Sequence, residues 1–176
     1  MLLKSRDHRT MPKDTFKPLK PDDLCRLIDT HGAALILYAK QWNASDAEDV
    51  VQETFLRLVR RAQWEGKPEN PAAYLFTAVR NEAIDRQRKA KRRKRHENQA
   101  ASERPVWLET PPDSSLRAGE LLETLDRLPM EQREIVVARI WGGLTFDEIA
   151  AMTGDSRTTV HRRYGEALET LREQLS

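Results

Sequence analysis

Four carboxylates lie close together in the sequence, at Asp46, Glu48, Asp49 and Glu53. Neighbouring carboxylates can bind a metal ion or act as a general acid and base. No histidine accompanies them at helical spacing, and carboxylates are also favoured at a helix N-terminus, where they face the positive end of the helix dipole. We therefore expect neither a catalytic nor a metal site here. Asp49, Gln52 and Glu53 do share one polar face of an expected helix, which suits a basic protein partner.

A second group of candidates is the basic run Arg86–Arg95, in which eight of ten residues are Lys or Arg. Such runs can be solvated tails or targeting signals, and they can also bind nucleic acid. This run continues an expected helix with a regular apolar seam, which favours nucleic-acid contact. Lys and Arg side chains on such a helix would contact phosphates, which positions a helix without reading sequence.

The most specific pattern lies near the C-terminus, where Ala150, Gly154 and Val160 have the spacing of a helix-turn-helix motif. A small Ala lets two helices cross closely, Gly adopts the positive φ of the tight turn, and Val packs the second helix onto the first. The alternative is an ordinary helical hairpin with a glycine turn. In the motif, the N-terminal half of the second helix enters the major groove of DNA.

Composition limits the other possibilities. The chain has 176 residues, of which 39% are hydrophobic and 33% charged, and its single cysteine, Cys25, excludes a disulfide framework. No apolar run approaches the roughly 18 residues of a membrane span, and the polar start of the chain lacks the apolar region of a signal peptide. No glycine-rich phosphate loop or Ser/His/Asp set is present. We expect a cytoplasmic protein that is not an enzyme, with no metal, no cofactor and no membrane span.

Charge is strongly segregated although the net charge is only +2. Residues 80–95 carry nine basic and two acidic side chains, whereas residues 131–156 carry two basic and five acidic ones. This alternation indicates one surface for a polyanion and another that meets a cationic partner.

The periodicity of apolar residues predicts an all-α protein with two small helical domains. We expect a flexible basic tail over residues 1–20, a helical domain over 21–95, a flexible linker over 96–116 and a helix-turn-helix domain over 117–176. The linker prediction rests on prolines and serines with little periodicity.

Several local signals define the expected helices. Gly32 could interrupt the first helix, and Ser45 with Glu48 predicts a capping box at the start of the second. Pro71 suits the first turn of a third helix. Thr145 with Glu148 predicts another capping box, and Ser156 is expected to cap the last helix. The predicted buried positions are Val51, Phe55, Leu58, Leu75, Phe76, Val79, Ala83, Ile135, Val136, Ile140, Val160, Tyr164, Ala167 and Leu171.

Three stretches together resemble the extracytoplasmic-function (ECF) group of bacterial sigma factors, the small two-domain members of the sigma-70 family. Asp46–Phe55 (DAEDVVQETF) is similar to the polymerase-binding helix of region two. Asn70–Arg86 (NPAAYLFTAVRNEAIDR) is similar to the helix that handles the minus-ten promoter element. Leu128–Leu171, which begins LPMEQRE, is similar to region four. Their order and spacing make the resemblance specific.

The resemblance implies a sigma factor that binds core RNA polymerase, directs it to specific promoters and helps melt the minus-ten region, with an anti-sigma factor as a possible further partner. Promoter DNA would be contacted both as duplex and as the melted non-template strand. The implied polymerase-binding residues are Asp49, Gln52 and Glu53. For the minus-ten element they are Trp64, Asn70, Arg80, Asn81, Asp85 and Arg88, with phosphate contacts from Lys89, Arg92 and Arg93. For the minus-thirty-five element they are Ser156, Arg157, Thr158, Thr159, His161, Arg162 and Arg163.

Two other functions are compatible with parts of the sequence. A stand-alone helix-turn-helix regulator would bind duplex DNA as a dimer, but it leaves the acidic face at Asp49–Glu53 unused. An RNA-binding adaptor that uses Arg86–Arg95 would leave the C-terminal motif unexplained.

Overall fold

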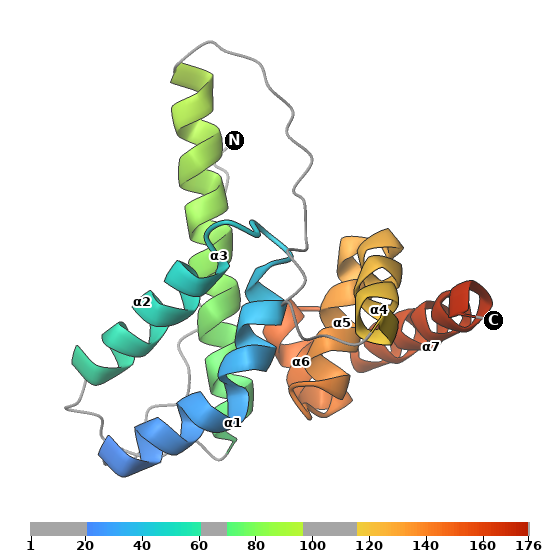
Figure 1. Ribbon diagram of the computed structural model, residues 1–176, viewed down its shortest axis with the longest axis horizontal. Helices are drawn as coiled ribbons and strands as arrows, with labels where there is room; N and C mark the ends of the chain where they lie inside the picture. Colours follow the sequence, from blue (N-terminus) through green and yellow to red (C-terminus); the bar gives the residue numbers. More distant parts are fainter. Residues whose placement is uncertain (1–20, 61–69, 97–115, 176) are drawn as a thin grey trace, which may run out of the picture.

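The computed structural model describes residues 21–60, 70–96 and 116–175, and these ranges contain seven α-helices and no strand. This confirms the predicted all-α class. Figure 1 shows α1–α3 on one side of the molecule and α4–α7 on the other. The bounds are α1 Pro21–Ala39, α2 Ala47–Arg60, α3 Pro71–His96, α4 Leu116–Arg127, α5 Met130–Ile140, α6 Phe146–Thr153 and α7 Arg157–Leu175.

The N-terminal helices α1–α3 pack against one another around aromatic side chains. The Tyr38 ring lies edge-on to Trp42 and to Phe76, with centroid distances of 5.2 and 4.9 Å. The predicted apolar faces of α2 and α3 are both buried here, including Phe55 and Val79. Burial of these two stripes fixes which faces of α2 and α3 point outward.

Two predictions about these helices are wrong. α1 runs without a break through Gly32, because a packed helix of 19 residues tolerates the roughly 1 kcal/mol cost of one interior glycine. The capping box of Ser45 with Glu48 does not form. α2 begins at Ala47, and the Ser45 hydroxyl instead bonds to the side chains of Asn43 and Asp46.

The C-terminal helices form a second packed group. Pro129 precedes α5, and the buried Arg133 guanidinium donates to the main-chain oxygens of Asp126 and Leu128, at 2.6 and 2.9 Å. This side chain fixes the turn between α4 and α5. The predicted buried positions on α7 are confirmed at Val160, Ala167 and Leu171, while Tyr164 is partly buried and packs against the core.

Ile140 is the exception among the predicted core residues, because it is 50% exposed. The chain folds back directly after α5, and the Leu144 amide bonds to the Ala138 carbonyl oxygen at 3.1 Å. Leu144 is fully buried, so this residue rather than Ile140 completes the core at the end of α5.

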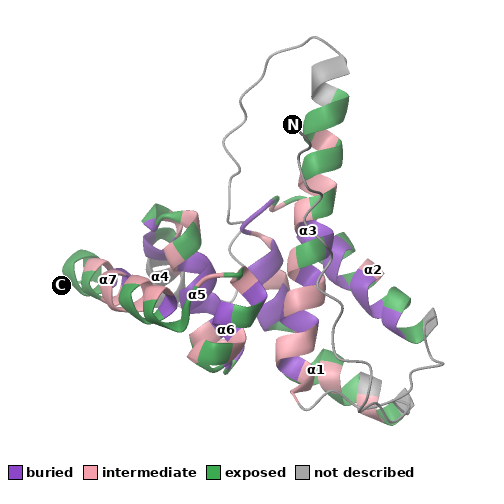
Figure 2. Cartoon of the chain, turned by 180° about the vertical axis from the view of Figure 1, so that it is seen from behind, coloured by how far each residue is buried: buried purple, intermediate pink, exposed green. Residues whose placement is uncertain are grey.

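The two groups of helices share a hydrophobic cluster. It joins Leu35, Tyr38 and Phe76 from α1 and α3 with Ile135 and Met152 from α5 and α6. α1 packs against α5 and α3 against α6. Figure 2 shows buried residues continuing from one group into the other. The sequence predicted two domains but did not predict this contact between them.

Candidate nucleic-acid interface

The outer face of α2 carries Asp49 and Gln52, both exposed. Glu53 is partly exposed and accepts a hydrogen bond from Arg57 Nε at 3.0 Å. This hydrogen bond is the largest of the interactions that raise the pKa of Arg57. The structure therefore presents Asp49 and Gln52 to solvent and turns the Glu53 carboxylate toward Arg57.

Glu82 is the residue in this region that sequence reasoning missed. Its carboxylate is 7% exposed and lies between two guanidinium groups, with Arg57 Nη1 at 2.6 Å and Arg86 Nε at 3.0 Å. Arg86 also donates to the main-chain oxygen of Asp49 at 3.3 Å. Glu82 thus ties α2 to α3. The spacing of four residues between Glu82 and Arg86 was the only signal of it in the sequence.

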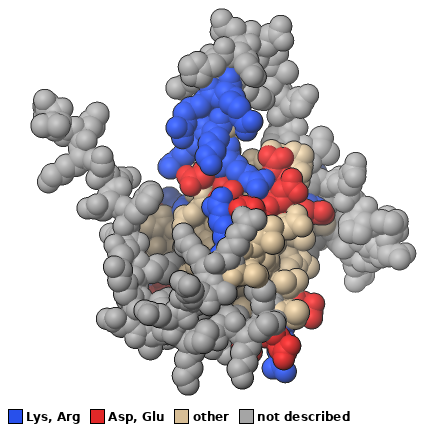
Figure 3. Space-filling model, turned by 90° about the vertical axis from the view of Figure 1, so that its left-hand side faces the viewer, with Lys and Arg blue, Asp and Glu red and all other residues tan. Residues whose placement is uncertain are grey.

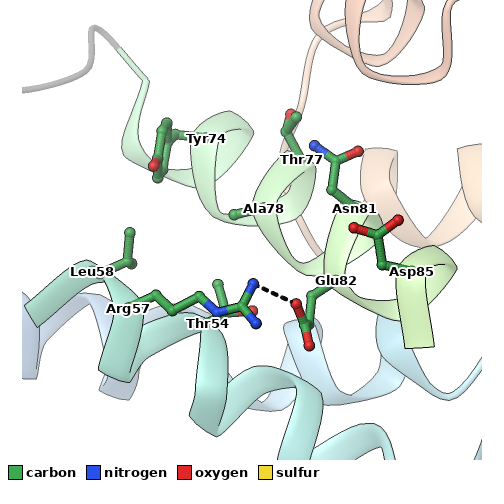
Figure 4. Close-up of a pocket in the computed structure, with 9 residues that line it drawn as sticks. All are labelled: Thr54, Arg57, Leu58, Tyr74, Thr77, Ala78, Asn81, Glu82 and Asp85. Carbon is green, nitrogen blue, oxygen red and sulfur yellow. Dashed lines mark ion pairs between the residues drawn. The ribbon is translucent and has the colours of Figure 1, made fainter. Parts of the chain in front are cut away.

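A cavity of about 260 Å³ lies between α2 and α3 (Figure 4). That is slightly below the size range of sites for drug-sized ligands. Asn81 and Asp85 are exposed at its α3 side, and Tyr74 lies nearer the start of that helix. Its lining consists of Thr54, Arg57, Leu58, Tyr74, Thr77, Ala78, Asn81, Glu82 and Asp85.

The second half of α3 projects beyond the other helices (Figure 1). Arg88, Lys89, Arg92 and Arg93 are all exposed there. Arg88 lies 3.9 Å from Asp85, and both side chains are more than 60% exposed. Figure 3 shows the Lys and Arg side chains gathered on this projecting part, next to a group of acidic ones. The arrangement gives a continuous cationic surface suited to phosphates.

Two predicted minus-ten residues, both partly exposed, bond to carboxylates of the C-terminal helices. Arg80 Nε lies 2.6 Å from Glu134 Oε1, and Asn70 Nδ2 donates to Glu148 Oε1 at 2.7 Å. Burial opposes the charge on Arg80, but the Glu134 carboxylate outweighs it and the pKa of Arg80 is raised. The Asn70 side-chain oxygen also caps α3 by accepting from the Ala72 and Ala73 amides.

The predicted helix-turn-helix is formed by α6 and α7. Thr145 and Glu148 make the predicted capping box, and Gly154 ends α6 with φ of 81°. Ser156 Oγ accepts from the Thr159 amide at the start of α7, as expected of a cap. Ala150 and Val160 are buried between the two helices.

The exposed residues at the start of α7 are Arg157, Thr158, His161 and Arg162. The remaining predicted residues are engaged within the motif. Ser156 and Thr159 pair with each other at 2.9 Å, and Arg163 Nη1 lies 2.7 Å from Asp155 Oδ2. Arg162 pairs with Glu166, one turn further on, and the His161 ring lies edge-on to Phe146.

Trp64, the remaining predicted minus-ten residue, lies outside the described residues. Among the residues that the structure does describe, no group of His, Cys, Asp and Glu side chains could hold a metal ion. Within those same ranges, no helix is long and apolar enough to cross a membrane.

Comparison with known proteins agrees with this geometry. The profile of Sigma-70 region 2 matches residues 27–93, and that of Sigma-70 region 4 matches residues 124–173. The ECF RNA polymerase sigma factor SigL of Mycobacterium tuberculosis is 34% identical over 151 residues, covering 83% of this chain and 85% of SigL. The chain belongs to the ECF group of sigma-70 family sigma factors.

Other relatives support the same assignment. The RNA polymerase sigma factor SigV of Bacillus subtilis is 28% identical over 134 residues, covering 76% of this chain and 78% of SigV. Among solved structures, sigma factor RpoE of Bartonella quintana, in complex with the anti-sigma factor NepR, superposes with a TM-score of 0.70 at 26% identity. That match covers 88% of this chain and 96% of RpoE. CnrH, in complex with the cytosolic domain of CnrY, has a TM-score of 0.58 at 26% identity and covers 89% of each chain.

The function of this protein is therefore that of an ECF sigma factor in transcription initiation. It binds core RNA polymerase and directs the enzyme to promoters. The stand-alone regulator is not favoured, because both sigma-70 regions are present in order and the relatives are sigma factors.

Proposed function

We propose that the two groups of helices recognise different parts of the promoter. Residues 21–95 would form the domain that binds polymerase and opens the minus-ten element, and residues 117–176 the domain that reads the minus-thirty-five element. The observation that carries this assignment is the cavity between α2 and α3, bordered by the exposed Asn81 and continued by the cationic end of α3.

The polymerase-binding surface is Asp49, Gln52 and Glu53. Asp49 and Gln52 are exposed on the outer face of α2, while the opposite face of that helix is buried against α1 and α3. An exposed helix face that carries acidic and amide side chains suits a basic helix of another protein. When polymerase binds, the Glu53–Arg57 pair would either rearrange or remain at the rim of the interface.

The cavity between α2 and α3 receives one unstacked base of the melted non-template strand. A flipped base is typically held by hydrogen bonds to its polar edge and by stacking on an aromatic side chain. Asn81 and Asp85 supply donors and acceptors at the cavity mouth, and Tyr74 supplies an aromatic ring in its lining. Arg80 is assigned to the same strand, and Asn70 and Trp64 to the approach to it.

Phosphates of the opening duplex are bound by Arg88, Lys89, Arg92 and Arg93. All four are exposed on the projecting half of α3. These contacts are independent of sequence and fall off with salt, because each one releases counterions from DNA.

The minus-thirty-five element is read by the start of α7. Arg157, Thr158, His161 and Arg162 face solvent and would reach base edges or phosphates. Ser156, Thr159 and Arg163 hold the helix start in place through their contacts inside the motif. Their part in binding would be to position α7.

Partners and location follow from the same assignment. The protein acts without a catalytic residue of its own and works in the cytoplasm, where core polymerase is found. Both solved relatives were captured with a second protein, NepR for RpoE and the cytosolic domain of CnrY for CnrH. An anti-sigma factor is the corresponding regulatory partner proposed for this chain.

Transcription with purified core polymerase tests the proposal. The protein is mixed with core enzyme and a promoter library, and start sites are mapped. We expect start sites that share a two-part motif, and Asn81→Ala is expected to reduce open-complex formation on all of them. The matched control is Gln174→Ala, an exposed amide near the end of α7 and away from the cavity. Wild-type activity of Asn81→Ala would refute the role of the cavity.

A further inference from the structure

The exposed Arg162 of α7 is bonded to a carboxylate one turn further along the helix. Its Nη1 atom donates to Glu166 Oε1, four residues on. The other carboxylate oxygen, Glu166 Oε2, accepts a hydrogen bond from Gln132 Nε2 on α5 at 3.3 Å. One oxygen therefore bonds to the arginine and the other to a neighbouring helix. These contacts fix the carboxylate from two sides, and through it they fix the direction of the Arg162 side chain.

The part of α7 that carries this pair is open to solvent. The side chains of Arg162 and Glu166 are 62% and 42% exposed. Between them lies Gly165, where an added Cβ would have open space around it. Glycine inside a helix is less favourable than alanine, so packing within the described structure does not account for Gly165. A glycine at this point lets another molecule approach the backbone of α7 closely.

The contact between Arg162 and Glu166 affects orientation more than stability. An ion pair between exposed side chains adds little to the free energy of unfolding, because water screens the charges. An arginine side chain that is free in solvent has many rotamers, whereas one bonded to a fixed carboxylate has few. The described contact uses only Nη1, so Nε and Nη2 of Arg162 remain available to a second pair of acceptors.

Guanine is the base whose major-groove edge matches these two donors. It presents two adjacent acceptors, N7 and O6, whereas adenine, cytosine and thymine each present at most one acceptor there. Phosphate oxygens also accept from arginine, but they carry no sequence information. An arginine that moves freely can bind either a guanine or a phosphate. An arginine beside a fixed carboxylate is kept from the phosphates, because the carboxylate repels them.

We propose that Glu166 is a positioning residue, which holds Arg162 toward the base edges so that this arginine reads a guanine of the minus-thirty-five element. The inference rests on the base-reading role proposed for Arg162. Glu166 itself makes no contact with a base. Its charge lowers the affinity of α7 for DNA in general, and its bond to Arg162 raises the selectivity for one base. Gln132 supports this arrangement from α5 by holding the second carboxylate oxygen.

Replacement of the carboxylate by an amide tests this role. Glu166→Gln keeps the length of the side chain but removes the charge that holds the guanidinium group. Glu169→Gln is the matched control, because it makes the same change at an exposed position of the same helix. Arg162→Ala, alone and combined with Glu166→Gln, shows whether Glu166 acts through Arg162. Urea unfolding checks that each variant is folded.

The readout is the base preference of the assembled holoenzyme. Each variant is combined with core polymerase and bound to a promoter library with a randomised minus-thirty-five element, and the bound DNA is sequenced. We expect the wild type and Glu169→Gln to prefer guanine at one position by about tenfold, as a bidentate contact provides. Glu166→Gln should reduce this preference to about twofold, while its binding to promoters without that guanine stays equal or rises. In the Arg162→Ala background, Glu166→Gln should change the base preference no further.

Three outcomes would overturn the positioning role. The guanine preference could be unchanged in Glu166→Gln, or affinity could rise equally for every promoter, which would make Glu166 a repulsive charge only. A further change of base preference on top of Arg162→Ala would mean that Glu166 contacts DNA itself. Failure of the proposed function gives a different result, in which Arg162→Ala weakens binding to all promoters equally. That result refutes base reading by Arg162 and its positioning together.

Discussion

A hydrogen bond between Asn70 and Glu148, which are 78 residues apart in the sequence, joins the N-termini of α3 and α6. The Asn70 Nδ2 group donates to Glu148 Oε1 at 2.7 Å, while the Asn70 oxygen caps α3 and Glu148 Oε2 caps α6 through Thr145. Each side chain therefore serves its own helix and the contact between helices. Replacement of either residue should therefore weaken both its own helix N-terminus and the contact between α3 and α6.

Replacement of Asn70 separates these two effects. Asn70→Ala leaves the Ala72 and Ala73 amides without their cap, and we expect a loss of about 1–2 kcal/mol in the free energy of unfolding, measured by urea titration. Asn70→Asp keeps a good cap but places a second carboxylate beside Glu148. It should therefore retain most of the stability while weakening the contact between α3 and α6. Equal stability of Asn70→Ala and wild type would contradict the cap.

The capping box on α6 predicts a pH dependence. Burial tends to raise the pKa of Glu148, but hydrogen bonds from Thr145 and Asn70 and the charge of Arg139 outweigh it and lower the pKa below its usual 4.5. A carboxyl with a lowered folded-state pKa adds stability above pH 4.5 and loses it as pH falls through the folded value. The difference in unfolding free energy between wild type and Glu148→Gln should thus be largest near neutral pH and shrink below pH 4.5. A difference that is constant with pH would show that charge plays no part.

Local signals in the sequence were sufficient for most of the helices. Thr145, Gly154 and Ser156 act through neighbours within four residues, and their predicted roles in the helix-turn-helix are confirmed. The error at Ser45 has the same local origin, because Asn43 competes for its hydroxyl. Ile140 was misplaced because apolar periodicity does not show where the chain turns back.

Contacts across long sequence distances could not be predicted in this way. Tyr38 and Glu134 are 96 residues apart, and neither lies in a motif that points to the other. Arg80 was assigned to DNA from its place in the minus-ten helix, and the sequence held no sign that a carboxylate of α5 would pair with it. The opposite charges of residues 80–95 and 131–156 predicted one surface for a polyanion and another for a cationic partner. They did not predict that a basic residue of the first segment would pair with an acidic residue of the second.

Glu82 should be important for the packing of α2 on α3. Glu82→Gln keeps the shape of the side chain but removes its charge and one of the two oxygens that accept from Arg57 and Arg86. Because Arg57 is half exposed and can regain water, we expect a loss of about 1 kcal/mol rather than the larger cost of a fully buried pair. Thermal and urea unfolding measure it, with Asp85→Asn on the exposed side of α3 as control. A loss of unfolding free energy no larger than that of Asp85→Asn would mean that the contacts of Arg57 and Arg86 with Glu82 do not stabilise the packing of α2 on α3.

The outer face of α2 makes a prediction about polymerase. Replacement of both Asp49 and Glu53 by Lys reverses the charge of this face, and we expect loss of co-elution with core polymerase while the circular dichroism spectrum stays unchanged. The control replaces the exposed Glu169 and Glu173 of α7 by Lys, which makes the same change in net charge elsewhere. Unchanged affinity of the α2 variant for core enzyme would make this face a solvated surface only.

The exposed start of α7 distinguishes base reading from phosphate contact. Arg162 is exposed and pairs only with Glu166 of its own helix in the described structure, so Arg162→Ala removes little from the fold. If Arg162 reads a base, its loss should weaken promoter use by about 1–3 kcal/mol and relax specificity at one position of the minus-thirty-five element. Arg163→Ala should act differently, because it breaks the Asp155 contact at the turn and lowers stability together with binding to every promoter. Transcription from a set of single-base promoter variants measures both. An equal loss for Arg162→Ala on all variants would assign this side chain to a phosphate.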